Sequence, residues 1–167
     1  NLGNEITNHM KQELMAEINR EILNDVRALA MLGGIVKTLD FDTVFTGLES
    51  SISGNYDDTH KLILDAINMM CAKIQTQGRM GRGNFVIANP ETLSFLNRVP
   101  GFVGSGVTYT GRDISYLGAL GGKLKFYADP YYPFNEFLIG FKGSGALETC
   151  YMHCPYLPIT STPTLLN

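Results

Sequence analysis

The chain has 167 residues, of which 44% are hydrophobic and 17% charged, and a formal net charge of −3. This length and composition suit one packed domain, or a large part of one, and exclude an intrinsically disordered chain. The small negative charge, without a block of like charges, argues against a nucleic-acid-binding surface that depends on phosphate contacts.

Other features of the sequence bear on where the chain works. No apolar run approaches the ~20 residues of a membrane-spanning helix, and the first residues lack the basic start and apolar core of a signal peptide. Three cysteines (Cys71, Cys150 and Cys154) do not make a disulfide framework, which favours a reducing compartment. Because the chain starts with Asn rather than Met, we expect a processed product or a fragment of a longer protein.

The first predicted element is a long helix. Apolar residues recur every four positions, charged residues cover the other faces, and Gly33-Gly34 gives a C-terminal stop. About 27 residues at ~1.5 Å each make a rod of roughly 40 Å, longer than the mean globular helix. We expect this rod to brace an extended structure. The apolar stripe comprises Ile6, Met10, Leu14, Ile18, Ile22 and Val26.

A second helix follows an irregular link. Glycine and serine residues interrupt the short apolar stretches of residues 35–58, which predicts a segment made mostly of loops with at most one short strand. Asp57-Asp58 then favours the start of a helix, and Gly78 favours its end. After a glycine-rich turn, residues 84–88 predict a short buried strand.

A third helix is predicted after this strand, with Asn89 as its N-cap and Pro90 at its first position. Its apolar residues are Leu93, Phe95, Leu96 and Val99. Residues 100–116 carry four glycines and predict a mobile loop, with a candidate strand at 107–109.

The last third of the chain predicts extended structure. A turn of small residues at 117–122 leads into two strands, 124–128 and 137–141, in which apolar residues alternate with period two. Residues 150–159 contain two prolines and predict an edge strand. The predicted helices and strands together place the chain in the α+β class.

The glycine-rich turn is the one segment that suggests a phosphate site. A phosphate loop presents backbone amides at the start of a helix, but here the glycines follow a helix and precede a strand. A Gly-Lys-Ser/Thr sequence is also missing. We therefore interpret the segment as a helix-to-strand turn, and Arg79 and Arg82 as surface or interface charges.

Metal and hydrolase chemistry have weak support. Cys150 and Cys154 with His153 between them hint at zinc, but a structural site needs four ligands, and an alternating strand would separate the histidine from the cysteines. A Gly-x-Ser-x-Gly elbow is absent from the sequence. We expect no catalytic residue, no metal and no cofactor.

An aromatic loop follows the first of the two last strands. Tyr131, Tyr132 and Phe134 come directly after Asp129-Pro130. Loops of this kind contact a neighbouring subunit or pack on their own chain, and the sequence does not separate the two; stacking on a ligand is a weaker third alternative. The candidate subunit-interface residues are Arg79, Arg82, Tyr131, Tyr132 and Phe134.

Four segments carry more information together than singly. They are residues 13–22 (ELMAEINREI), 81–88 (GRGNFVIA), 120–129 with LGGK and YAD, and 139–158 with IGFKG and CPYLP. In this order and spacing they resemble the major capsid proteins of tailed, contractile-tail bacteriophages related to the T-even phages. The resemblance spans almost the whole chain.

The resemblance implies the Johnson fold, first described in phage Hong Kong 97, in incomplete form. It implies a spine helix and link of the peripheral domain at 1–56, the axial domain at 57–145, and a return to the peripheral domain at 146–167. Family members are several hundred residues long, so the N-terminal arm, the extended hairpin loop and the C-terminal strand segment would lie outside this chain.

The resemblance also implies a function. The chain would belong to a subunit that self-assembles into hexamers and pentamers of an icosahedral head around double-stranded DNA, made in the bacterial host cytoplasm and located in the virion. Further partners would be vertex, portal, scaffold or decoration proteins, without sequence-specific nucleic-acid or membrane binding. Three alternatives stay open: a pentameric vertex protein, an encapsulating-compartment or adhesion protein of the same fold, and a nucleotide-binding enzyme domain that uses the turn at 78–83.

Overall fold

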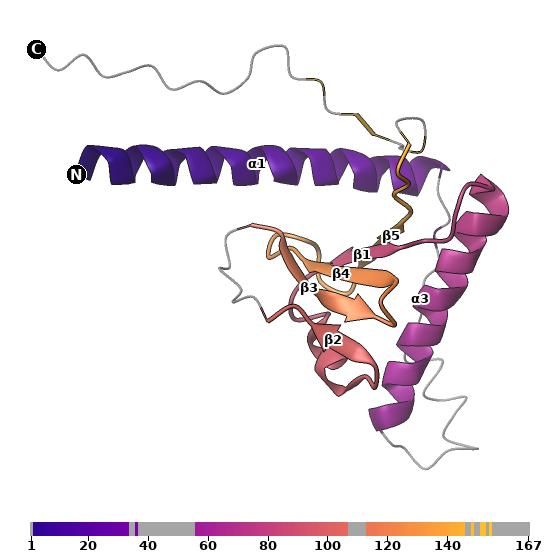
Figure 1. The fold of residues 1–167 in the computed structure, drawn as a ribbon. Helices are drawn as coiled ribbons and strands as arrows, with labels where there is room; N and C mark the ends of the chain where they lie inside the picture. The colour runs from indigo at the N-terminus through magenta and orange to yellow at the C-terminus, as the bar shows by residue number, and fades with distance from the viewer. Residues whose placement is uncertain are drawn as a thin grey trace, which may run out of the picture.

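The computed structural model describes residues 2–33, 36, 56–106, 113–145, 148, 151, 152 and 154. These residues form two long helices, one short 3-10 helix and a five-stranded mixed sheet (Figure 1). The expected α+β class is confirmed. The predicted strand at 107–109, most of the link at 35–58 and most of the predicted edge strand at 150–159 lie outside the described residues.

Both long helices occur where the sequence predicts them. Helix α1 runs over Leu2–Gly33 and α3 over Tyr56–Gly78. Thirty-two residues give α1 a length of about 48 Å, so the predicted rod is confirmed. α1 lies across one end of the sheet, and its N-terminal half extends past the sheet (Figure 1).

The sheet has the order β2-β3-β4-β1-β5. Strand β1 sits between β4, to which it is parallel, and β5, to which it is antiparallel; the β2–β3 and β3–β4 pairs are also antiparallel. The strands are β1 (Phe85–Ala88), β2 (Phe102–Gly104), β3 (Ser115–Leu120), β4 (Leu124–Ala128) and β5 (Phe137–Gly140).

The main core lies on one face of the sheet. Period-two alternation in β4 turns Leu124, Phe126 and Ala128 to this face, as the sequence predicts, and all three are buried. Helix α3 covers them with Ile67 and Cys71. The other buried members of this core are Val86, Ala88, Leu93, Phe95, Leu96 and Val99.

A smaller core lies on the opposite face, beneath the C-terminal half of α1. Leu23 packs there with Ile87, Tyr132 and Leu138, and Val26 and Ala30 lie beside them. The sheet is therefore held between α3 on one face and part of α1 on the other.

The predicted third helix is wrong in kind. The segment is a turn followed by a five-residue 3-10 helix, η1 (Ser94–Arg98), and Leu93 rather than Asn89 precedes it. The Asn89 side-chain oxygen accepts the Glu91 amide at 3.0 Å, which closes a local Asx turn instead of starting an α-helix. The four predicted apolar residues are nevertheless all buried.

The predicted loop at 100–116 and the predicted turn at 117–122 are wrong in part. Strands β2 and β3 occupy 102–104 and 115–120, and the turn itself is confined to 121–123. The glycines misled the prediction: Gly118 sits at a β-bulge with φ of 155°, inside a strand rather than a turn. A Cβ there would overlap the carbonyl oxygen of Val103 across the strand pair.

This contact gives a test of the β2–β3 pairing. We expect Gly118→Ala to lower the free energy of unfolding by about 1–2 kcal/mol, because the new methyl group pushes β2 away and the backbone angle disfavours a side chain. Urea unfolding of the unassembled protein measures the change. Gly121→Ala is the matched control, since a Cβ at Gly121 would meet no atom within 4 Å although its φ is also positive. Equal losses in the two variants would contradict the role of the contact.

Candidate subunit interface

The glycine-rich turn is closely packed rather than open. A Cβ on Gly81 would overlap the ring of Phe141, and one on Gly83 would lie 3.0 Å from the Cys71 sulfur. The Gly83 amide donates to the Cys71 carbonyl at 3.2 Å. These glycines let the chain pass close to α3 and enter β1, and they follow the helix C-terminus, whose dipole disfavours phosphate.

The two arginines of this turn point to solvent. Arg82 donates to the backbone and side-chain oxygens of Asn68 on α3 at 3.5 and 3.3 Å. Arg79 has a φ of 54°, a conformation that ends α3 after Gly78. Both side chains are exposed and available to a partner.

The aromatic loop is fixed in place by Asp129. Its side-chain oxygen accepts the Tyr131 amide at 3.0 Å, and its carbonyl accepts the Tyr132 amide at 3.2 Å. Only 4% of Asp129 is exposed, and this burial raises the pKa of its carboxyl group. On the other side of the loop, Asn89 donates to the Tyr132 carbonyl at 3.1 Å.

The three aromatic residues of the loop have different surroundings. Tyr132 is 6% exposed and packs inside its own chain, whereas Tyr131 and Phe134 are 59% and 60% exposed. The Arg20 guanidinium lies 5.5 Å from the centre of the Tyr131 ring. Of the three, Tyr131 and Phe134 therefore offer surface to a neighbour, while Tyr132 positions the loop.

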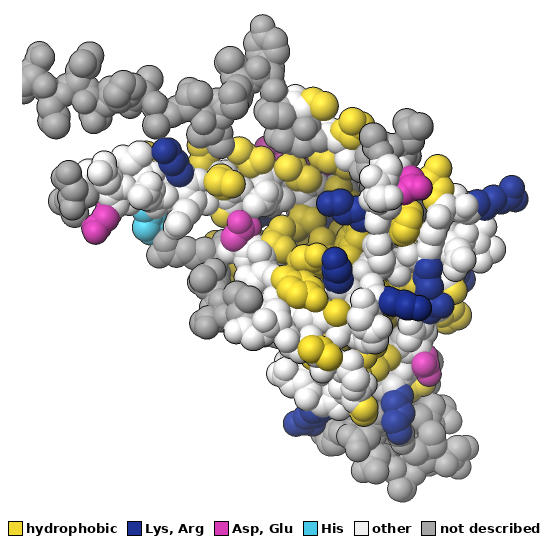
Figure 2. Space-filling model, in the orientation of Figure 1, with side chains coloured by type: hydrophobic (Ala, Val, Ile, Leu, Met, Phe, Trp, Pro, Cys, Tyr) yellow, Lys and Arg dark blue, Asp and Glu magenta, His cyan; other side chains and the backbone are white. Residues whose placement is uncertain are grey.

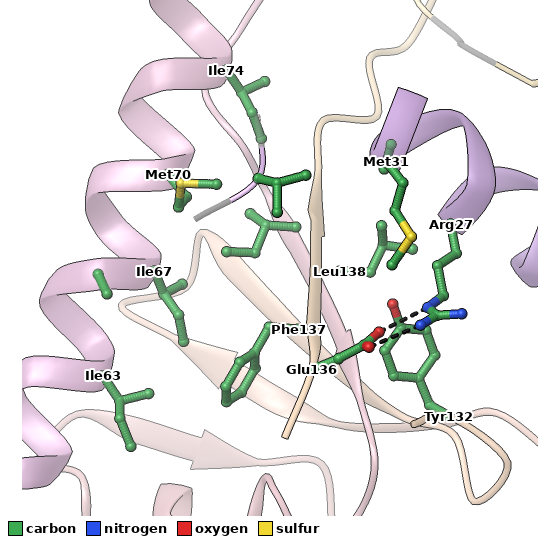
Figure 3. Close-up of a pocket in the computed structure, with 14 residues that line it drawn as sticks. Arg27, Met31, Ile63, Ile67, Met70, Ile74, Tyr132, Glu136, Phe137 and Leu138 are labelled. Atoms are coloured by element: carbon green, nitrogen blue, oxygen red, sulfur yellow. Dashed lines mark hydrogen bonds and ion pairs between the residues drawn. The ribbon is translucent and has the colours of Figure 1, made fainter. Parts of the chain in front are cut away.

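An ion pair that sequence reasoning missed joins α1 to the sheet. Arg27 donates from two nitrogens to the two carboxylate oxygens of Glu136, both at 2.8 Å (Figure 3). This hydrogen bond raises the pKa of Arg27. Tyr132 lies against the pair, and its burial beside Glu136 raises its pKa to about 12. We call Arg27, Tyr132 and Glu136 the clamp.

A double-mutant cycle tests the clamp. The two side chains of the ion pair are 30% and 38% exposed, so we expect a coupling energy of about 1 kcal/mol between Arg27→Met and Glu136→Gln. The value comes from urea unfolding of the wild type, both single variants and the double variant. The exposed pair of Arg20 and Glu17, at 3.4 Å, is the comparison and should couple less. A clamp coupling no larger than that of this surface pair would contradict the assignment.

An apolar cavity of about 280 Å³ lies between the end of α1, α3 and β5. Ile63, Ile67, Met70 and Ile74 of α3 line one wall, and the clamp stands at the edge (Figure 3). Among the lining residues that the structure describes, the clamp supplies the only polar side chains, and Arg27 and Glu136 of the clamp are already paired with each other. Among the described residues, no cluster of three His, Cys, Asp or Glu side chains is arranged to hold a metal ion.

The N-terminal half of α1 carries apolar side chains on its surface. Ile6, Met10, Leu14 and Met15 are each about half exposed or more. The predicted stripe thus divides: its C-terminal part packs on the sheet, and its N-terminal part contacts no other described element. A helix with such an uncovered stripe fits a subunit that binds a partner.

A family model described as Major capsid protein Gp23 matches residues 1–167. The chain belongs to this family of major capsid proteins. It is 30% identical over 173 residues to the major capsid protein of Vibrio phage KVP40, which covers 93% of this chain and 33% of that protein. It is 26% identical over 176 residues to those of Enterobacteria phages T6 and T4, again over 93% of this chain and 34% and 32% of those proteins.

The chain spans about a third of the length of these curated major capsid proteins. No solved structure matches it significantly. The family is a structural one, which agrees with the packed glycine turn. Neither long helix in the described part of the chain is apolar enough to cross a membrane.

Proposed function

We propose that the longer protein is a shell subunit, which self-assembles into hexamers and pentamers of an icosahedral phage head around double-stranded DNA. The observation that carries the proposal is the family match over the whole chain. The exposed apolar side chains of α1 support it, since apolar side chains grouped on a surface are typical of a site where other protein packs. Head-to-tail contacts close into rings under rotational symmetry, and many modest contacts add up in a closed shell.

The proposed fold is the Johnson fold in incomplete form. On this proposal, residues 1–56 contribute the spine helix and link of the peripheral domain, 57–145 the axial domain, and 146–167 the return to the peripheral domain. The long α1 beside a separate sheet with its own α3-covered core is consistent with that division.

The proposed location is the virion, after assembly in the host cytoplasm. Self is the main partner, and vertex, portal, scaffold or decoration proteins are further partners of such a shell. Arg79, Arg82, Tyr131 and Phe134 are the candidate contact residues, because all four are exposed. Tyr132 takes part through the loop that it anchors rather than by touching the neighbour.

Electron microscopy of the full-length product tests the proposal. We expect closed particles, or rings of six or five subunits, when the protein is produced together with its scaffold protein. A stable monomer that turns over a small-molecule substrate would overturn the proposal. Rings of five alone would favour the vertex alternative.

The nucleotide-binding alternative has a separate test. The side chains of Phe141 and Cys71 pack against Gly81 and Gly83, which leaves no room for a phosphate group at this turn. We therefore expect titration with ATP or GTP to show no saturable binding. Saturable binding that is lost in Arg82→Ala but kept in Lys73→Ala, a variant at an exposed residue on nearby α3, would revive that alternative.

A further inference from the structure

Two segments that carry the family resemblance are far apart in the sequence but meet in the structure. One is the glycine-rich turn, which ends in Asn84, and the other is the end of β5 with the residues after it. The Asn84 amide donates to the Gly140 carbonyl at 2.8 Å, and the Lys125 amide donates to the Asn84 carbonyl at 3.0 Å. The backbone of Asn84 thus already belongs to the sheet, one residue before β1 begins.

One residue earlier, the backbone of the turn leaves the sheet. β1 and β5 are antiparallel with Phe85 opposite Gly140, so continued pairing would bring Gly83 opposite Lys142. The Gly83 amide instead donates to the Cys71 carbonyl of α3 at 3.2 Å, and Gly83 packs against the Cys71 side chain. Helix α3 therefore takes the backbone donor that regular pairing would offer to Lys142.

The side chain of Asn84 takes the place that Gly83 leaves. Its Nδ2 donates to the Lys142 carbonyl at 2.8 Å, and its Oδ1 accepts the Lys142 amide at 2.9 Å. Two residues that face each other in an antiparallel pair exchange the same two bonds through their backbones. A carboxamide suits this role because it carries a donor and an acceptor on one planar group, whereas an ionised carboxylate has no donor.

The turn also receives the side chain between these two backbone contacts. The ring of Phe141 lies where a Cβ on Gly81 would be. Three residues of the turn thus have three separate contacts: Gly81 with Phe141, Gly83 with α3, and Asn84 with Lys142. The glycine-rich turn holds the end of β5 in the place where a phosphate loop would hold a ligand.

Beyond Lys142 the chain leaves the sheet on the side of α1 (Figure 1). Gly143 packs against the carboxylate of Glu148, because a Cβ on this glycine would overlap a carboxylate oxygen. The same oxygen accepts the Gly145 amide at 3.3 Å, and the Glu148 amide donates to the Gly145 carbonyl at 3.1 Å. These contacts continue the path that Asn84 begins.

The path ends at α1. Tyr151 donates from its hydroxyl group to the Asp25 carboxylate at 3.2 Å. Asp25 is two residues before Arg27 of the clamp, a turn of about 200° around the helix, so the two contacts hold α1 from nearly opposite sides. We call the described residues of this path the strap. It comprises Phe141, Lys142, Gly143, Gly145, Glu148 and Tyr151.

From these contacts we infer that Asn84 is a positioning residue, whose carboxamide extends the sheet to Lys142 and so directs the strap from β5 to α1. The inference does not depend on the proposed shell function, because all of its contacts lie within one chain. Loss of the carboxamide should release the strap but leave β1 and β4 paired, since that pairing joins Phe85–Ala88 to Lys125–Ala128 through the backbone.

Hydrogen exchange of the full-length protein, read at single amides by mass spectrometry, tests the inference. We expect Asn84→Ala to raise the exchange rate of the Lys142 amide about tenfold, because the variant loses two hydrogen bonds. The amides of β1 and β4 should keep their wild-type rates. Asn68→Ala is the matched control, because Asn68 is an exposed asparagine on neighbouring α3. It should leave the Lys142 amide unchanged.

An isosteric variant separates the donor from the size of the side chain. Asn84→Asp keeps an acceptor for the Lys142 amide but places a carboxylate oxygen against the Lys142 carbonyl, so exchange should again rise several-fold. The surroundings are basic: Figure 2 shows Lys and Arg side chains over the C-terminal end of α3, beside the turn. Because these charges favour a carboxylate, a rise in exchange would come from the missing donor. Wild-type exchange in Asn84→Asp would overturn the inference.

The reach of the effect along the strap separates direction from a local hydrogen bond. If Asn84 directs the strap, Asn84→Ala should also raise the exchange rate of the Gly145 amide, which donates to Glu148. Tyr151→Phe, which removes the bond to Asp25, should raise exchange at Gly145 but not at Lys142.

Two results of the Asn84→Ala experiment would contradict the inference. An increase confined to Lys142 would mean that Asn84 makes a local bond and directs nothing beyond it. An equal increase at Lys142 and throughout β1 and β4 would mean that Asn84 stabilises the whole sheet rather than the strap. Both results would leave the shell function standing, because electron microscopy tests that function separately.

Discussion

Phe126→Ala should lower the free energy of unfolding by about 3–5 kcal/mol, the largest loss that we expect from a single substitution in this chain. Phe126 is 0% exposed, at the centre of the main core. Its ring meets Phe102 edge-on, with ring centres 6.0 Å apart, so truncation removes an aromatic pair as well as buried area. The measurement is urea unfolding of the unassembled protein, followed by circular dichroism.

The neighbour on the same strand supplies the control. Lys125 is exposed on the opposite face, so Lys125→Ala should change the free energy of unfolding by less than about 0.5 kcal/mol. The contrast follows from the period-two geometry of β4, in which adjacent residues face different sides. Comparable losses at the two positions would mean that β4 is not arranged as described.

The features that sequence could predict depend on neighbours along the chain. In β4, alternation alone identifies Leu124, Phe126 and Ala128 as the buried set, and burial confirms it. The same holds for α3, where residues spaced by three and four, among them Ile67 and Cys71, form one face. A long helix or strand repeats its pattern of apolar residues several times, so one atypical residue does not obscure the pattern.

The features that sequence could not predict depend on contacts between distant residues. Arg27 and Glu136 are 109 positions apart, and nothing local to either marks it as the partner of the other. Gly118 suggested a turn because glycine favours turns, but here its lack of a side chain permits a close strand pair with Val103. The sequence predicted Asn89 as a helix N-cap, but its side-chain oxygen accepts the Glu91 amide in an Asx turn instead. An N-cap and an Asx turn use the same acceptor oxygen, so the residue type alone does not distinguish them.

The division of the α1 stripe shows the same limit for function. Spacing by four residues links Met10 to Val26, but each step turns by about 40° around an α-helix, so the two side chains point to nearly opposite sides and only Val26 packs on the sheet. A stripe read from spacing alone therefore does not show which of its members face the sheet, because that depends on how the helix is turned against the strands.

Tyr132 should make the stability of the protein depend on pH in the alkaline range. Its pKa in the folded state is raised to about 12, mainly by burial and then by the charge of Glu136, against 10 as the ordinary value. The folded state therefore keeps the phenol proton between pH 10 and 12, while the unfolded state loses it. Because the unfolded state then binds fewer protons, stability falls as pH rises through this window.

The expected loss is about 2–3 kcal/mol between pH 10 and 12, the equivalent of a shift of about two pKa units in a buried group. Tyr132→Phe keeps the ring and removes the proton, so the pH dependence that Tyr132 contributes disappears. We compare urea unfolding of the two proteins at pH 9, 10, 11 and 12; every other titrating group is common to both, so the difference isolates Tyr132. Parallel curves for the two proteins would mean that the phenol titrates normally, and the clamp would then not hold Tyr132 in a desolvated position between α1 and the sheet.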